Sequence, residues 1–209
     1  YGELKTTGAK QTVLFYAHYD GQPVDPKRWQ GSAPFEPSLR GGKAEDPEAR
    51  VYARSASDDK GTIIAMLAAL DSLRSGGQAP TVNLKFLFEG EEEAGSQNLG
   101  RILKAHPAES AADFWLICDG PVHQTRQPQV YFGARGVTAF GLKVYGPKRE
   151  LHSGHYGNWA PNPAMQLARL LASMKDDEGR VTISGFYEGV APLSPSEIAA
   201  MKAEPPVDA

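Results

Sequence analysis

The chain has 209 residues, of which 41% are hydrophobic and 22% charged, which is the ordinary composition of a globular protein with one domain, or with one domain and part of another. Its formal net charge of −3 lacks the basic character of nucleic-acid-binding and membrane-surface proteins, and its apolar runs are too short to cross a bilayer. The single cysteine, Cys118, excludes an intrachain disulfide and leaves the redox compartment open. We therefore expect no nucleic-acid or membrane partner, and we expect a cytoplasmic location.

The first part of the chain is predicted to fold around buried strands. The run Val13–Asp20, VLFYAHYD, has no regular alternation of apolar and polar residues, which suits a strand inside a mostly parallel sheet. Further apolar runs predict the remaining elements, and a connection rich in proline, glycine and charge, 21–50, is predicted to be loop. Strands are predicted over 12–17, 51–55, 82–88 and 113–118, and helices over 62–73 and 99–104. This order predicts an α/β fold with a mixed, mainly parallel sheet flanked by helices.

The pattern changes near residue 133. Gly136–Tyr145 alternates between apolar and polar residues, which is typical of an antiparallel strand with one exposed face. Pro163 suits the first turn of a helix that is predicted to end near Met174, and 181–186 predicts one more strand. We therefore expect a first domain over 1–132 and an incomplete α+β domain over 133–209.

Polar side chains stand where the strands of the first domain are predicted to end. The carboxyl ends of parallel strands meet at one edge of a sheet, so we expect these side chains to converge there. Any one of them alone has a simpler explanation as a helix cap or a surface group, and the evidence is that the pattern recurs four times. The residues are His18, Asp20, Asp58, Glu92, Glu93 and Asp119.

This set of residues has the chemistry of a metal site. One histidine with several carboxylates suits zinc, and manganese or cobalt are alternatives. Carboxylates that converge without a cation would repel one another and would be costly to bury, so a divalent metal is the natural compensation. The sequence therefore predicts a metal centre at this edge of the sheet.

Five ordered blocks carry a resemblance to a known family. They are His18-x-Asp20, Ser57-Asp58-Asp59-Lys60-Gly61, Glu92-Glu93-Ala94-Gly95-Ser96, Asp119 and His152-Ser153-Gly154. Together they resemble the dinuclear zinc metallopeptidases that include carnosinase, glutamate carboxypeptidase, aminoacylase and succinyl-diaminopimelate desuccinylase. The stretches HYDGQPVDP and LFEGEEEAGS are most similar to the carnosinase-like dipeptidases. The resemblance implies a catalytic domain of the zinc-exopeptidase type, followed by part of a lid or dimerisation domain.

The resemblance also implies a role for each residue. In the implied pair of divalent metal ions, one would be held by His18 and Asp119 and the other by Glu93, with Asp58 bridging the two. Glu92 would be the general base, and Asp20 would hydrogen-bond the far nitrogen of His18 and fix its tautomer. His152 would reach the active site of a partner subunit and stabilise the oxyanion. The Asp58–Asp59 peptide bond is expected to be cis.

One part of the family pattern has no counterpart in these residues. The family uses a fifth ligand, a histidine near the C-terminus of a longer chain, and His106, His123 and His155 do not match it. The chain also begins at Tyr1 and ends in a proline-rich stretch. We therefore expect a piece of a longer protein, an under-coordinated metal at Glu93, and no activity from the 209 residues alone.

The implied reaction is hydrolysis of the amide bond of dipeptides or similar small peptides by a metal-activated water, with Glu92 as the base. Deacylation of N-acyl amino acids is the alternative within the same chemistry. A non-catalytic metal-binding or interaction protein on the same fold, and a structural domain whose acids are only caps, are alternatives of other classes. Glu92 favours an enzyme, because a binding protein needs no base. The implied partners are a small peptide or N-acyl amino acid substrate and a second copy of the chain, in a homodimer through the lid.

Overall fold

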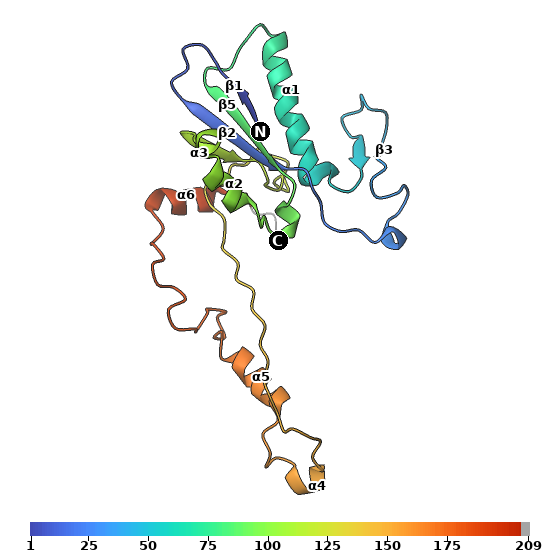
Figure 1. Cartoon of the computed structure of the whole chain (residues 1–209), viewed down its shortest axis with the longest axis vertical. Helices are drawn as coiled ribbons and strands as arrows, with labels where there is room; N and C mark the ends of the chain where they lie inside the picture. Colours follow the sequence, from blue (N-terminus) through green and yellow to red (C-terminus); the bar gives the residue numbers. More distant parts are fainter. Residues whose placement is uncertain (206–209) are drawn as a thin grey trace. The chain divides into compact units, whose positions relative to one another are not determined.

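The computed structural model describes residues 1–205, and the chain divides into two compact units, Tyr1–Val122 and His123–Ala209 (Figure 1). The first unit contains a sheet with helices packed on it, and the second, as far as residue 205, contains three helices joined by long connections. The domain boundary predicted between residues 132 and 133 falls within the second unit and stays a prediction.

The first unit is built around a mixed four-stranded sheet with the strand order β1-β5-β2-β6. β2 (Thr12–His18), β5 (Asn83–Glu89) and β6 (Phe114–Ile117) run parallel, and β1 (Gly2–Leu4) is antiparallel to β5. β2 is an inner strand of this sheet, and Leu14 and Ala17, which point to opposite faces, are both 0% exposed. The mainly parallel sheet predicted from the apolar runs is therefore confirmed.

Helices cover both faces of this sheet. On one face, α1 (Thr62–Ser75) places Met66 beside Phe15 of β2. On the other face, α2 (Leu99–Ala105) and the short α3 (Pro107–Ser110) lie over Leu14 of β2. Both predicted helices are confirmed, with ends shifted by one or two residues. The largest described helix, α1, has 14 residues, and none of the described helices has the length and apolar character that a membrane span needs.

The connection after β2 is more ordered than the sequence predicted. It contains a helical turn, η1 (Pro26–Arg28), and then β3 (Ser38–Arg40), which pairs antiparallel with β4 (Arg50–Tyr52). The prediction of a loop over 21–50 is wrong at β3, and β4 covers only the start of the strand predicted over 51–55. Gly41 follows β3 with a φ of 82°, a left-handed conformation that glycine adopts without steric cost.

The second unit contains α4 (Ser153–Tyr156), α5 (Pro163–Ala172) and α6 (Pro195–Ala203). α5 confirms the helix predicted from Pro163. Asn162 caps its first turn by accepting hydrogen bonds from the backbone N–H groups of Ala164 and Met165 at 2.9 and 3.2 Å. α6 was not predicted, although Ser194 forms a capping box with Glu197.

The two strands predicted in the second unit are not formed in the described part of the chain. The stretch 136–145 pairs with no other strand, and 181–186 contributes only an isolated bridge between Lys175 and Val181. Alternation of apolar and polar residues specifies which side chains share a face, but a strand also needs a neighbour that takes its backbone hydrogen bonds. Val137 and Tyr145 are accordingly exposed.

Candidate metal centre

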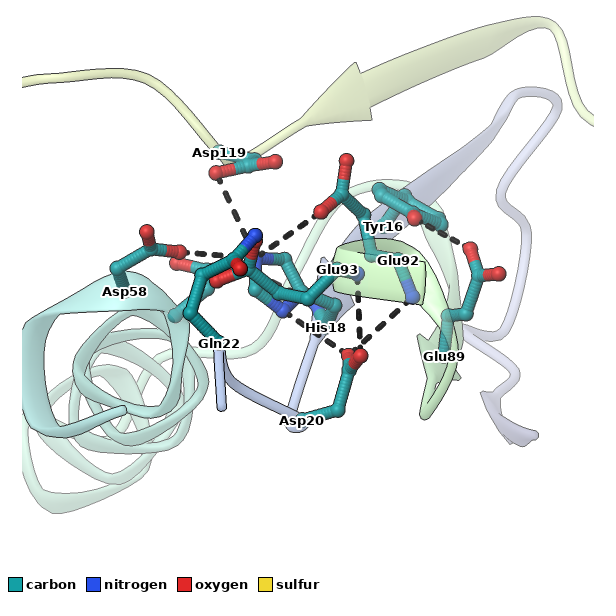
Figure 2. A network of polar contacts seen from close by, with 10 residues as sticks. Tyr16, His18, Asp20, Gln22, Asp58, Glu89, Glu92, Glu93 and Asp119 are labelled. Atoms are coloured by element: carbon teal, nitrogen blue, oxygen red, sulfur yellow. Dashed lines mark hydrogen bonds and ion pairs between the residues drawn. The ribbon is translucent and has the colours of Figure 1, made fainter. Parts of the chain in front are cut away.

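The polar residues predicted to converge come from four elements at one edge of the sheet (Figure 2). His18 is the last residue of β2, and the helical turn η3 (Glu92–Ala94) follows β5. Asp119 lies two residues beyond β6, and Asp58 lies in η2 (Ala56–Gly61), just before α1. Since β2, β5 and β6 are parallel, the topology of the sheet brings His18, the turn η3 and Asp119 together.

The ring of His18 lies at the centre of the cluster and is 1% exposed. Its Nε2 atom is 2.9 Å from Asp58 Oδ1, 3.8 Å from Asp119 Oδ1 and 4.0 Å from Glu92 Oε2. One ligand atom each of His18, Asp58 and Asp119 lies within 4.8 Å of the others, so these three residues could hold one metal ion. Glu92 lies beside this group of three.

The cluster places several carboxylates around one buried imidazole ring. Burial lowers the pKa of His18, but the carboxylates of Asp119, Asp58 and Glu92 together outweigh it, so that the pKa is raised. Burial is also the largest cause of the raised pKa values of Asp119 and Glu92, and neighbouring carboxylates add to both. A divalent cation would stabilise the ionised carboxylates, and an imidazole nitrogen with two carboxylate oxygens fits such an ion. The residues present therefore fit the metal that the sequence predicted.

Asp20 connects the two sides of the cluster. Its Oδ1 lies 3.2 Å from Nδ1 of His18, although the two atoms are not aligned as a hydrogen bond. Its carboxylate also accepts the backbone N–H groups of Glu92 and Glu93 at 3.3 and 3.0 Å. Asp20 thus contacts the His18 ring and fixes the turn that carries both glutamates, a second contact that the sequence did not predict.

The buried side chain of Asp59 holds the backbone of His18 in place. It is 2% exposed, and its Oδ2 accepts the backbone N–H of His18 at 3.2 Å. The Asp58–Asp59 peptide bond is cis, as the resemblance implied. The doubled aspartate was visible in the sequence, but only the structure shows that the second one holds the backbone of His18.

Two further contacts near the cluster were missed. The amide of Gln22 donates a hydrogen bond to Glu93 Oε2 at 2.6 Å, and the hydroxyl of Tyr16 donates one to Glu89 Oε2 at 2.5 Å (Figure 2). Burial and then the contact with Glu89 raise the pKa of Tyr16 well above its usual range. The partners are 71 and 73 residues apart in the sequence, so no local pattern could have indicated either pair.

The structure does not bring every predicted site residue into the group of three. Glu93 lies in η3 next to Glu92, and its carboxylate accepts a hydrogen bond from the side-chain amide of Gln22. His152 belongs to the second unit, where its Nδ1 accepts the backbone N–H of Gly154 at 3.0 Å and its ring lies 4.9 Å from that of His155. The role of His152 toward a partner subunit stays a prediction.

Comparison with known proteins gives consistent matches. The sequence profile of peptidase family M20/M25/M40 matches residues 14–204. The chain is 34% identical over 203 residues to the human Beta-Ala-His dipeptidase and 31% identical over 198 residues to a Cys-Gly metallodipeptidase of Schizosaccharomyces pombe. These alignments cover 96% and 94% of this chain.

Solved structures agree with these matches. An M20 family metallo-carboxypeptidase from Sulfolobus solfataricus superimposes with a TM-score of 0.70 at 36% identity, covering 96% of this chain and 44% of that one. Human carnosine dipeptidase 1 gives a TM-score of 0.55 at 29% identity, covering 97% and 41%. The chain spans only 39% and 40% of the human and yeast relatives.

Proposed function

The chain belongs to peptidase family M20/M25/M40, and on that premise we propose that the protein is a metal-dependent hydrolase that cleaves the amide bond of dipeptides. The observation that carries the proposal is the convergence of His18, Asp58 and Asp119 within 4.8 Å, with the carboxylate of Glu92 beside them. A cluster of this kind provides metal ligands and a separate base at one place, which amide hydrolysis requires.

We assign the ligands of two divalent ions to this chain's residues. His18, Asp58 and Asp119 would hold the first ion, and Glu93 together with Asp58 would contribute to the second. The ions would be zinc, with manganese or cobalt as alternatives, given one imidazole and several carboxylates. When bound, they would polarise the substrate carbonyl and lower the pKa of a water from about 15.7 toward about 7.

Glu92 is the proposed general base. Its carboxylate lies 4.0 Å from His18 Nε2, and burial raises its pKa, which suits a group that must both accept and return a proton. Glu92 would take a proton from the attacking water and pass it to the leaving amine. Asp20 positions this base, because it holds the backbone N–H of Glu92, and Asp59 positions His18 in the same way.

The names of the relatives support the proposed substrate class. Beta-Ala-His and Cys-Gly are dipeptides, and similar proteins from yeasts and mammals carry those names. They favour dipeptide hydrolysis over the deacylation of N-acyl amino acids.

We also propose that the protein is a homodimer through the second unit, where His152 would donate to the oxyanion of the partner's site, and that it is cytoplasmic. Analytical ultracentrifugation and cell fractionation would test these two points.

The test of the proposed function is Glu92→Gln in the complete protein. Turnover of Beta-Ala-His or Cys-Gly should fall by about 10²–10⁴-fold, the usual contribution of a positioned base, while the bound metal stays unchanged. Glu45→Gln, in an exposed loop, is the matched control and should retain wild-type turnover. Wild-type turnover by Glu92→Gln would contradict the assignment of Glu92 as the base. If the wild-type protein hydrolyses N-acyl amino acids but neither dipeptide, the substrate class is N-acyl amino acids instead.

A further inference from the structure

We propose that Gln22 is a positioning residue for Glu93 and that it thereby sets the affinity of the second metal ion. The inference rests on the proposed function, because it assumes that Glu93 is a metal ligand. The observation behind it is the hydrogen bond between the Gln22 side-chain amide and Glu93 Oε2, at 2.6 Å (Figure 2).

The chemistry of the two groups fixes the orientation of this contact. A carboxylate only accepts hydrogen bonds, so the NH₂ group of Gln22, and not its carbonyl oxygen, must face Glu93. A hydrogen bond to an ionised acceptor is shorter and stronger than one between neutral groups. The bond engages one oxygen of the Glu93 carboxylate and leaves the other oxygen for an ion.

The same short loop holds Glu93 at two points. Asp20, at the start of the loop, accepts the backbone N–H of Glu93 at 3.0 Å, and Gln22, two residues later, holds its carboxylate. The loop itself has little freedom. Pro23 restricts the backbone of Gln22 to extended conformations, and Gly21 lies so close to Ser55 that a Cβ there would be 1.9 Å from Ser55 Oγ. The backbone that carries Gln22 is therefore restricted, and its amide reaches Glu93 from there.

The first and second ions should differ in their dependence on Gln22. His18, Asp58 and Asp119 have their ligand atoms gathered without any help from Gln22. Glu93 is outside that group and only partly buried, so without Gln22 its carboxylate would be free to turn, and binding an ion would cost the loss of that freedom. Partners that orient a metal ligand typically change metal affinity by about 10–100-fold.

The test is Gln22→Met in the complete protein, which keeps the length of the side chain and removes the donor. Gln97→Met is the matched control, because Gln97 is also exposed and its amide, within the described part of the chain, reaches only the carbonyl of Ala94, at 3.5 Å. Gln22→Asn keeps the amide but shortens its reach by one methylene. Zinc alone is the probe. Its affinity is measured by chelator competition, and the unfolding temperature of the metal-free protein is measured as a check on folding.

The expected result is that Gln22→Met weakens one zinc site by about 10–100-fold, leaves the other unchanged, and does not alter the unfolding temperature of the metal-free protein. Gln22→Asn should lie between this variant and the wild type, and Gln97→Met should match the wild type. Unchanged affinity at both sites would overturn the inference. So would tighter binding of the second zinc, because the amide would then be competing with the cation. Lower stability of the metal-free Gln22→Met protein would also overturn it, by assigning Gln22 a structural role.

The two proposals fail in different ways. A wild-type protein that binds two zinc ions but hydrolyses neither dipeptide contradicts the proposed function, and the comparison of metal affinities still decides on Gln22. A wild-type protein that binds one zinc ion per chain and hydrolyses the dipeptides contradicts the Gln22 proposal alone, since the second ion would not exist, and one that binds no zinc contradicts both proposals.

Discussion

The hydrogen bond between Tyr16 and Glu89 predicts a measurable loss of stability when the tyrosine hydroxyl is removed. Tyr16 is 7% exposed and Glu89 is 8% exposed, and the O–H···O distance is 2.5 Å. Tyr16→Phe keeps the ring and leaves the Glu89 carboxylate buried without this donor. A hydrogen bond to a charged group contributes about 1.5–3 kcal/mol, so the free energy of unfolding should fall by about 2 kcal/mol.

The assay is urea unfolding of the complete protein, followed by circular dichroism. Tyr19→Phe is the matched control, because Tyr19 is 51% exposed and loses its hydroxyl at the surface, which should change stability by less than about 0.5 kcal/mol. A loss below about 0.5 kcal/mol in Tyr16→Phe, or equal losses in the two variants, would refute the reasoning.

The same pair predicts a dependence on alkaline pH. Burial and the contact with Glu89 raise the folded-state pKa of Tyr16 above its ordinary value of 10.0. The folded protein therefore holds this proton more tightly than the unfolded chain. The resulting stability is complete below about pH 10 and is lost as the pH rises toward the folded-state pKa. The stability difference between wild type and Tyr16→Phe should accordingly narrow above about pH 10, and a constant difference would contradict this.

Two further substitutions test the loop after β2. Gly21→Ala should lower the free energy of unfolding by about 1–3 kcal/mol, because the new Cβ would lie 1.9 Å from Ser55 Oγ. Ser55→Gly removes that hydroxyl, and glycine suits the φ of 61° at residue 55. In urea unfolding, the double variant Gly21→Ala/Ser55→Gly should therefore recover most of the lost stability. A double variant whose loss equals the sum of the two single losses would contradict the clash. Asp20→Ala should weaken zinc binding by about 10–100-fold in chelator competition, because two backbone N–H groups of η3 lose their acceptor. Asp25→Ala removes an acceptor for the backbone N–H of Lys27 and should leave zinc affinity unchanged. Equal zinc affinities of the Asp20→Ala and Asp25→Ala variants would show that Asp20 has no such role.

The parts of the fold that follow from local sequence could be predicted. The unbroken apolar run of β2 indicated a strand buried on both faces of a mostly parallel sheet, and the parallel strands then required that His18 and Asp119 lie at one edge. The strand predictions over 136–145 and 181–186 were wrong because alternation does not supply a pairing partner. Their predicted strands depended on contacts that the pattern itself does not encode.

The candidate site shows the same division. The ligand types and their positions at strand ends were visible in the sequence, and the structure brings His18, Asp58 and Asp119 together. The contacts of Gln22 and Asp59 were not visible, because they join residues 71 and 41 positions apart through particular side-chain orientations. Sequence patterns give the chemistry of such a site more readily than the groups that hold it in place.

The most direct test of the metal centre is elemental analysis of the complete protein after dialysis in dilute zinc. The arrangement of His18, Asp58, Glu93 and Asp119 predicts about two zinc ions per chain, and fewer in an Asp119→Asn variant that remains folded. A folded wild-type protein that retains no zinc, manganese or cobalt would contradict the assignment of this cluster as a metal centre.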